Sequence, residues 1–338
     1  MYTIIDYLKY YKNVLIEDIQ INIMDNLIFS ILVYLPIETF SGSMNLDEFY
    51  NYCLKYKSNE FVGNMTPISY EVLDLVHKSN RYKGLKISNF TKIRDNNTQF
   101  GAATFRIKDY TVISYKGTDG SLIGWVENIR IAYEYPSYTQ KLAINYLKNN
   151  IKSKDKNIYV SGHSKGGNLA MVSAMEYQKR IKKIYNFDGP GFRKKEFESI
   201  KYKKIENKLE NIIPSNSVIG TLLNNKNYKV VKSNKLAFEQ HYPNSWNIFG
   251  ECFIPSIQSN ISKQLHDSTT IGIDELDEDK IKETFEIIFS KLGKKYSSDF
   301  KFNLNDIKNV YINMKSIDPE IKNYIDTIID SMINALHK

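Results

Sequence analysis

The chain has 338 residues, of which 42% are hydrophobic and 25% are charged, and it carries a formal net charge of +8. This composition is ordinary for a globular protein, and the longest apolar run, residues 28–35, is too short to span a bilayer. Lysines are spread along the whole chain among acidic residues, which favours a solvated surface over a nucleic-acid interface. A weak contact with an anionic membrane surface stays open.

Two features indicate the compartment. The first twelve residues show no secretion signal, and the two cysteines, Cys53 and Cys252, lack the spacing of metal ligands. Both observations fit two thiols in a reducing environment. The sequence therefore predicts a cytoplasmic protein.

Apolar periodicity predicts helices first, then strands alternating with helices, then helices again. In chain order the expected elements are helices at 3–11, 22–35 and 67–79, strands at 102–107 and 110–115, a helix at 139–151, a strand at 158–160, a helix after residue 165, strands at 183–187, 209–213 and 228–232, and helices at 279–292, 305–315 and 319–336. Thr66 is the expected cap of the third helix, with Pro67 at its first position. The strand, helix and strand in the middle of the chain predict a right-handed crossover between parallel strands.

The segment Gly162-His163-Ser164-Lys165-Gly166 follows the apolar strand at 158–160 and precedes good helix-forming residues. This G-x-S-x-G pattern is typical of a nucleophile elbow, in which glycines permit a sharp turn and the serine hydroxyl is exposed. The backbone N–H of Lys165 and the positive end of the helix would then face a developing oxyanion. The alternative is a glycine-rich turn without chemistry.

A serine nucleophile needs a base, and in the α/β-hydrolase order the histidine comes last. Of the five histidines, His241 lies in a loop after the strand at 228–232 and is the candidate base. His266 and a purely structural role for His241 are the alternatives.

The acid can be sought between the serine and the last candidate histidine. Asp188 is the only aspartate between Ser164 and His266, and it follows the strand at 183–187. Its position at a strand end is where catalytic groups of α/β sheets gather. Glu206, Glu210 and Glu239 are rivals, and a turn-capping carboxylate is the alternative role for Asp188.

The loop after the strand at 110–115 is expected to supply the second oxyanion donor. Here the backbone N–H of Thr118, helped by its hydroxyl, would face Ser164, whereas the alternative is a plain turn. Further along, four residues are equally compatible with a lid over the pocket and with packing in the core: Trp125, Ile129, Tyr133 and Tyr135.

Several motifs together carry a resemblance: Tyr115-Lys116-Gly117-Thr118, Trp125, residues 162–170, Asn186-Phe187-Asp188-Gly189-Pro190-Gly191-Phe192, and Gln240-His241 with Ser245-Trp246. Over residues 1–250 the chain resembles an uncharacterised family of bacterial lipase-like α/β-hydrolases, a domain of unknown function related to the class 3, fungal-type lipases.

The resemblance implies the nucleophile at Ser164, the histidine at His241 and the oxyanion donor at Thr118. Two departures stand out. Class 3 lipases have glycine at the position of Asp188 and place their aspartate after the next strand, where this chain has Ser215-Asn216-Ser217. Lys165 stands where these lipases usually have leucine, which puts either a cation beside the oxyanion hole or a water-solvated side chain there.

The sequence thus predicts an α/β-hydrolase fold with a mostly parallel central sheet, a helical N-terminal region and a helical C-terminal extension. We expect residues 1–270 to form the hydrolase domain and residues 271–338 an extension that packs on it, although an independent partner-binding module is the alternative for the tail.

The predicted function is that of a serine esterase. It would cleave a small-molecule carboxylic ester, acyl or lipid-like, through an acyl-enzyme on Ser164, with Asp188 and His241 completing the triad and with no metal or other cofactor. A catalytically silent binding or regulatory protein, a thioesterase and a peptidase are the alternatives.

Overall fold

The computed structural model describes residues 1–57, 63–95, 98–119, 122–275 and 277–283, together with residues 286, 319, 322 and 326. In this part of the chain, eight strands form one sheet in sequential order, β1 to β8, and β9 and β10 form a small separate hairpin. The strands are β1 (Ser43–Asn45), β2 (Lys86–Arg94), β3 (Gln99–Ile107), β4 (Tyr110–Tyr115), β5 (Asn157–His163), β6 (Ile181–Phe187), β7 (Leu209–Pro214), β8 (Tyr228–Val231), β9 (Ile248–Phe249) and β10 (Cys252–Phe253).

The sheet changes direction once. Strands β1 to β4 pair antiparallel, whereas β4 to β8 pair parallel. The helices are α1 (Ile4–Tyr10), α2 (Ile23–Leu32), α3 (Leu46–Lys55), α4 (Met65–His77), α5 (Leu122–Arg130), α6 (Tyr138–Asn150), α7 (Lys165–Tyr177), α8 (Lys194–Phe197), α9 (Ile200–Ile205) and α10 (Asn260–Glu275). This is the α/β-hydrolase fold that the sequence predicts, with the helical N-terminal region in place.

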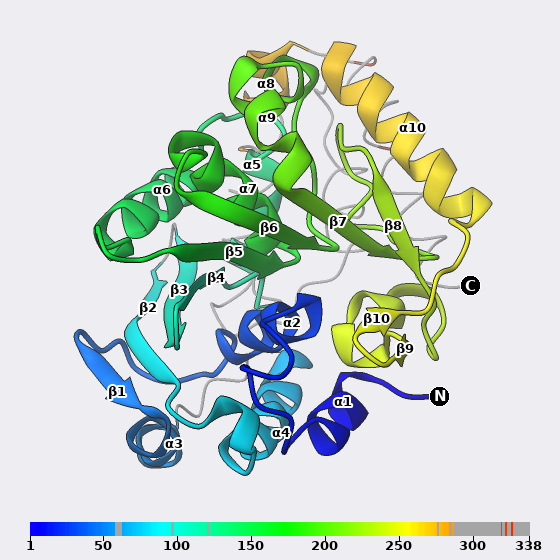
Figure 1. The fold of residues 1–338 in the computed structure, drawn as a ribbon. Coiled ribbons are helices and arrows are strands. Elements are labelled where there is room, and N and C mark those ends of the chain that lie inside the picture. Colours follow the sequence, from blue (N-terminus) through cyan, green and yellow to red (C-terminus); the bar gives the residue numbers. More distant parts are fainter. Residues whose placement is uncertain are drawn as a thin grey trace.

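The sheet lies between two helical layers (Figure 1). Helices α1 to α4 cover one face, and α6, α7 and α9 cover the other. Because successive side chains of a strand point to opposite faces, each strand packs against both helical layers. Val112 and Tyr159 pack with the N-terminal helices, while Ile113 and Val160 pack on α7. Because both faces are buried, the central strands are nearly continuous apolar runs.

Most predicted elements are present with small changes at their ends. The hairpin of β3 and β4, the parallel pairing of β4 with β5, and the strands β6 to β8 are confirmed. The helix expected at 22–35 ends at Leu32, because residues 34 and 35 tighten into i to i+3 hydrogen bonds before Pro36.

The predicted cap at Thr66 is wrong. Helix α4 begins at Met65, so Pro67 occupies its third position, where a missing N–H still costs no intrahelical hydrogen bond. Strand β2 was not expected from the sequence. Its register shifts between Ser88 and Thr91, and Asn89 has φ 52°, so a bulge interrupts the strand pattern.

Helix α10 was also missed, because two Ser, two Thr, three Ile and one Gly, all weaker helix formers than Ala or Leu, make up half of its sixteen residues. It runs through the boundary proposed at residue 270. The helix expected at 305–315, and most of those at 279–292 and 319–336, lie outside the described residues. Within the described ranges, every helix is too short or too polar to cross a bilayer.

A buried ion pair fixes the N-terminal layer. The Arg81 guanidinium donates from Nε to Asp25 Oδ1 at 2.8 Å and from Nη2 to Asp25 Oδ2 at 2.7 Å, and neither side chain is more than 1% exposed. Arg81 Nη1 also donates to the carbonyl oxygen of Ile19, and the Tyr82 hydroxyl donates to Asp25. The pair therefore ties α2, the loop before it and residues 80–82 together.

We predict that Arg81→Met lowers the free energy of unfolding by about 3–5 kcal/mol, because it leaves the Asp25 carboxylate buried without a cation. Lys78→Met is the matched control: its ion pair with Asp74 is solvent-exposed, so the loss should stay below about 1 kcal/mol. Urea unfolding followed by circular dichroism measures both values. Equal losses in the two variants would show that the buried pair has no special role.

Candidate active site

Ser164 lies on a strained turn between β5 and α7. Its backbone has φ 58° and ψ −135°, a region that residues with a side chain rarely adopt, and its side chain is nearly buried. The turn is held by a hydrogen bond from the Ser164 N–H to the Phe187 carbonyl, at 2.9 Å. A Cβ at Gly162 would lie 2.1 Å from the Gly166 carbonyl oxygen, so only glycine fits there. This geometry is that of a nucleophile elbow.

The loop after β4 lies directly against this turn. A Cβ at Gly117 would meet the Ser164 Cβ at 2.9 Å and the Tyr34 hydroxyl at 2.1 Å, so the absence of a side chain permits the close approach. Thr118 follows and lines the same cavity as Ser164. Its hydroxyl is buried and has no hydrogen-bond partner among the described residues.

Two backbone donors next to Ser164 are also unused. The N–H groups of Thr118 and Lys165 make no hydrogen bond within the described part of the chain. Lys165 is the first residue of α7, where a helix leaves its N–H groups free and its dipole favours negative charge. The structure therefore brings together the two loops from which the sequence predicts oxyanion donors.

Asp188 and His241 are in direct contact, as the sequence predicts. His241 Nδ1 lies 2.6 Å from Asp188 Oδ2. Because a carboxylate only accepts, Nδ1 carries the proton, and Nε2 is left as a proton acceptor. Asp188 is fully buried, whereas the His241 side chain is 11% exposed. This is the arrangement of an acid that orients a general base.

The second oxygen of Asp188 is held by the loop after β7. Ser217 Oγ donates a short hydrogen bond to Asp188 Oδ1, and the Gly220 N–H donates to the same oxygen at 3.1 Å. Asp188 itself has φ 53°, the left-handed region that favours glycine and that aspartate tolerates. Glycine is the residue that class 3 lipases have here.

The His241 segment is anchored by two residues whose roles the sequence did not reveal. The buried Gln240 side chain accepts from the Ser215 hydroxyl and from the Asn216 N–H, both at 3.1 Å. The indole N–H of Trp246 donates to the Gln240 carbonyl at 2.7 Å. The loop after β7 thus positions both Asp188 and His241.

His163 links the serine turn to the histidine loop. Its Nε2 donates to the His241 carbonyl at 2.8 Å, so Nδ1 is the acceptor that faces the Tyr34 hydroxyl at 3.1 Å. Burial, and then repulsion from His241, hold the pKa of His163 well below its usual 6.5. His163 therefore stays neutral and connects α2, the elbow and the His241 loop.

Lys165 does not project into water, so the alternative of a water-solvated side chain is wrong. Its side chain is fully buried, and Nζ donates to the Gln99 carbonyl at 2.6 Å and to Gln99 Oε1 at 2.9 Å. Gln99 Nε2 in turn donates to the Gly117 carbonyl at 3.1 Å. Burial lowers the pKa of Lys165. The Glu127 carboxylate, whose Oε2 atom lies 3.8 Å from Lys165 Nζ, partly offsets this effect. The ammonium thus braces the loop that carries Thr118.

The rival residues lie elsewhere. The Glu206 carboxylate pairs with Lys226 at 2.6 Å, and Glu239 is exposed and lies 4.0 Å from Lys235. Glu210 pairs with two lysines, which lower its pKa against the effect of burial. His266 Nδ1 faces the Thr221 carbonyl at 3.0 Å and does not line the Ser164 cavity.

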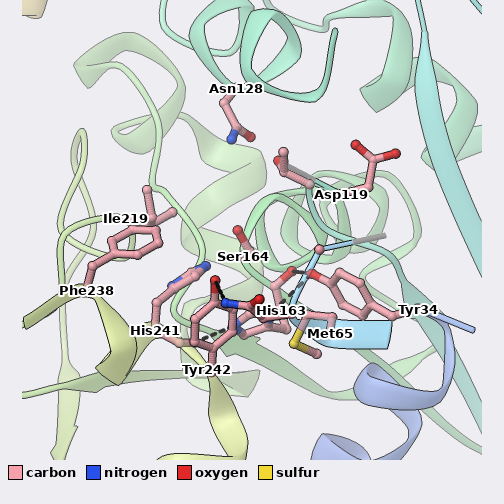
Figure 2. Close-up of a pocket in the computed structure, with 13 residues that line it drawn as sticks. Tyr34, Met65, Asp119, Asn128, His163, Ser164, Ile219, Phe238, His241 and Tyr242 are labelled. Carbon is pink, nitrogen blue, oxygen red and sulfur yellow. Dashed lines mark hydrogen bonds between the residues drawn. The ribbon is translucent and has the colours of Figure 1, made fainter. Parts of the chain in front are cut away.

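A cavity of about 100 Å³ opens above Ser164. Ile219 and Phe238 lie on one side, close to His241, while Met65 and Tyr34 lie on the other (Figure 2). Ser164 and His241 both line it, but within the described residues the Ser164 hydroxyl forms no hydrogen bond with the His241 ring. Such contacts are often long in unliganded sites and tighten when substrate binds.

Helix α5 contributes Asn128 to this cavity, and its Oδ1 atom is buried without a partner among the described residues. The proposed lid residues lie differently. Tyr133 is buried and packs as a core aromatic, whereas Tyr135 is 36% exposed and its ring packs edge-on against Phe192, 6.1 Å away. Ile129 is absent from the described cavity lining, and the Trp125 side chain lies outside the described residues.

Fold and site together define an α/β-hydrolase scaffold with a serine on an elbow and a buried acid–histidine pair beside it. The sequence model of a family described as Mbeg1-like matches residues 76–290, more than half of the chain, so the protein belongs to this lipase-like family. The match supports the lipase-like relationship predicted from the sequence; the bacterial origin of the family stays a prediction. No curated protein sequence matches the chain.

Two solved structures are similar over part of their length. M37 lipase is 17% identical over 58% of this chain and 67% of its own, with a TM-score of 0.39. A mutant form of MDLA from Penicillium cyclopium is 13% identical over 63% of this chain and 82% of its own, with a TM-score of 0.38.

The neutral His163 generates a prediction about stability. Its pKa is lower in the folded protein than in the unfolded chain, so below about pH 6.5 the unfolded state binds an extra proton and gains relative stability. Acidification from pH 7 to pH 5 should therefore destabilise the wild type more than His163→Gln, by up to about 1.4 kcal/mol per pH unit. Urea unfolding at several pH values measures the difference. Parallel pH profiles would show that His163 is protonated in the folded protein.

Proposed function

We propose that the protein is a serine hydrolase that cleaves a carboxylic ester through an acyl-enzyme on Ser164. The observation that carries the proposal is the 2.6 Å hydrogen bond between His241 Nδ1 and Asp188, next to an elbow serine in the same cavity. With Nδ1 protonated, His241 Nε2 is the acceptor that a nucleophilic serine requires.

In the first half-reaction, Ser164 Oγ attacks the ester carbonyl carbon while His241 Nε2 takes the hydroxyl proton. The tetrahedral intermediate then expels the alcohol, which receives that proton from His241, and an acyl-serine remains. In the second half-reaction, water attacks the acyl carbon while His241 Nε2 takes a proton from the water. His241 then returns this proton to Ser164 Oγ, and the carboxylic acid leaves. Asp188 holds the imidazole in the required tautomer throughout.

The negative oxygen of each intermediate needs donors that are already in place. We assign to it the N–H groups of Thr118 and Lys165 and the Thr118 hydroxyl, none of which has a hydrogen-bond partner among the described residues. Each such donor contributes roughly 10²- to 10³-fold to kcat in acyl-transfer enzymes. A buried hydroxyl without a partner is costly, which supports a functional reason for its orientation.

The cavity size favours a short acyl group. A cavity of 150 Å³ holds benzene, so one of about 100 Å³ accommodates roughly four carbon atoms. Met65, Ile219 and Phe238 supply apolar surface for it. We therefore propose small, short-chain esters as substrates, with no cofactor; a longer, lipid-like chain would extend beyond this cavity.

A second candidate is a catalytically silent binding protein on the same scaffold. The observation that favours it is that, in the part of the chain that the structure describes, no hydrogen bond joins the Ser164 hydroxyl to the His241 ring. A thioesterase or a peptidase would use the same acyl-enzyme chemistry with a different leaving group, so a serine-directed probe separates the silent scaffold from all three hydrolases.

We predict that a fluorophosphonate adds covalently to Ser164 and not to the Ser164→Ala variant, as measured by mass spectrometry. Asp188→Asn should lower kcat on 4-nitrophenyl butyrate by on the order of 10⁴, because the histidine loses the partner that sets its tautomer. Asp18→Asn, an exposed aspartate, is the matched control and should leave kcat unchanged. A folded wild type without adduct, under conditions that label a control esterase, would favour the silent scaffold.

Lys165→Met tests the brace behind the oxyanion loop. We expect kcat to fall roughly ten- to a hundredfold with little change in KM, because even a shift of about 1 Å in an active site can cost 10²-fold. Lys148→Met, an exposed lysine on α6, is the control. The double variant Lys165→Met/Glu127→Gln also removes the buried Glu127 carboxylate, which would lose Lys165 and keep only its ion pair with Arg130 among the described residues, and it guards against misfolding. Wild-type kcat in a folded Lys165 variant would contradict the bracing role.

A further inference from the structure

A second cavity borders the one that contains Ser164. It has a volume of about 500 Å³ and shares Asn64 and Tyr242 with the Ser164 cavity. Asn64 Nδ2 donates to the Tyr242 hydroxyl at 3.0 Å, so this hydrogen bond forms part of the boundary between the two spaces. We name the second cavity the polar groove, after its lining by Asp6, Asn64, Asn234, Lys235, Glu239 and Asn244.

The groove adjoins the segment of His241, against which the leaving group lies in the proposed reaction. In the proposed reaction, His241 must hand its proton to the alcohol oxygen, so the alcohol part of the ester lies against His241. Tyr242 follows His241 in the chain and lines both cavities. An alcohol that leaves past His241 and Tyr242 therefore enters the polar groove.

The groove offers hydrogen-bonding groups that are free to bind a ligand. The side-chain amides of Asn234 and Asn244 make no hydrogen bond within the described part of the chain, and each carries donors and acceptors. Paired donors and acceptors of this kind match hydroxyl groups, which also donate and accept. A purely apolar alcohol would form no hydrogen bond with these amides.

The charges of the groove favour an uncharged alcohol. Two carboxylates, Asp6 and Glu239, face two cations, the N-terminal ammonium of Met1 and Lys235, which lies 4.0 Å from Glu239. The lining therefore carries no net charge, so it has no surplus cation to pair with an alcohol that carries a phosphate or carboxylate. An uncharged, hydroxyl-rich alcohol needs no such counter-ion.

We propose that the polar groove is the leaving-group subsite and that the alcohol part of the substrate is an uncharged polyol such as a sugar. This inference rests on the proposed esterase function. It assigns the two ends of the substrate to different spaces: the short acyl group to the Ser164 cavity, and the polyol to the groove.

The test compares two esters with the same acyl group and six carbons in the alcohol, glucose 6-O-butyrate and hexyl butyrate. Both form the same butyryl-enzyme, so differences in kcat/KM report on the alcohol alone. The variant is Asn234→Leu/Asn244→Leu, with Asn244→Leu as a milder second variant. Asn149→Leu, an exposed asparagine on α6, is the matched control.

We expect the wild type to prefer the glucose ester, and the double variant to lose roughly tenfold in kcat/KM on it, the effect of two lost hydrogen bonds. Its kcat/KM on hexyl butyrate should stay within about twofold of wild type, which also reports correct folding. Asn149→Leu should match the wild type on both esters.

Three results would overturn the inference: a wild type that does not prefer the glucose ester, a double variant that keeps its full rate on it, or equal losses on both esters in both groove variants. Failure of the proposed function is a separate observation, because it would appear as a wild type that neither reacts with a fluorophosphonate at Ser164 nor hydrolyses 4-nitrophenyl butyrate.

Discussion

A carboxylate that is shielded from solvent needs hydrogen-bond donors from the protein, and this requirement at Asp188 determines the geometry of the whole site. Asp188 is fully buried at the end of β6, and its oxygens accept from three separate places: His241, Ser217 and the Gly220 N–H. Leaving any of them out would expose an unpaired charge to a low-dielectric interior. The loops after β6 and β7 and the segment with His241 therefore converge, and the convergence brings the imidazole to the cavity of Ser164.

The same interaction explains how the proposed acid can occupy a position that differs from that of class 3 lipases. Their aspartate would fall in the stretch Ser215-Asn216-Ser217, and here Ser217 instead donates to the carboxylate of Asp188. The two loops lie side by side, so either can place a carboxylate near Nδ1 of the histidine. The positive φ at Asp188 suits a glycine equally well. An exchange of the proposed acid and its supporting hydroxyl between neighbouring loops would thus preserve the local geometry.

The sequence predicts those features of the fold and the site whose signal lies in residues close together along the chain. The sheet from β3 onward, the elbow and the contact of Asp188 with His241 follow from strand patterns, glycine spacing and chain order, which are readable along the chain. Strand β2 was missed because its bulge breaks the alternation. The burial of Lys165 and the bridging role of His163 could not be predicted, since their partners, Gln99 and Tyr34, lie far away in the sequence.

Lys165 is a buried lysine at a position where the sequence suggests a surface side chain. Where related lipases carry leucine, a lysine suggests a surface position, yet this side chain is fully buried with Gln99 and Glu127. Its long apolar stem fills the space of a leucine, and the ammonium acquires hydrogen bonds that leucine lacks. One residue then contributes to both sides of the proposed oxyanion hole: its backbone N–H follows Ser164 and has no hydrogen-bond partner among the described residues, and its ammonium, through Gln99, restrains Gly117 and hence Thr118. Backbone conformation and side-chain burial at a single position are thereby coupled to the placement of both donors.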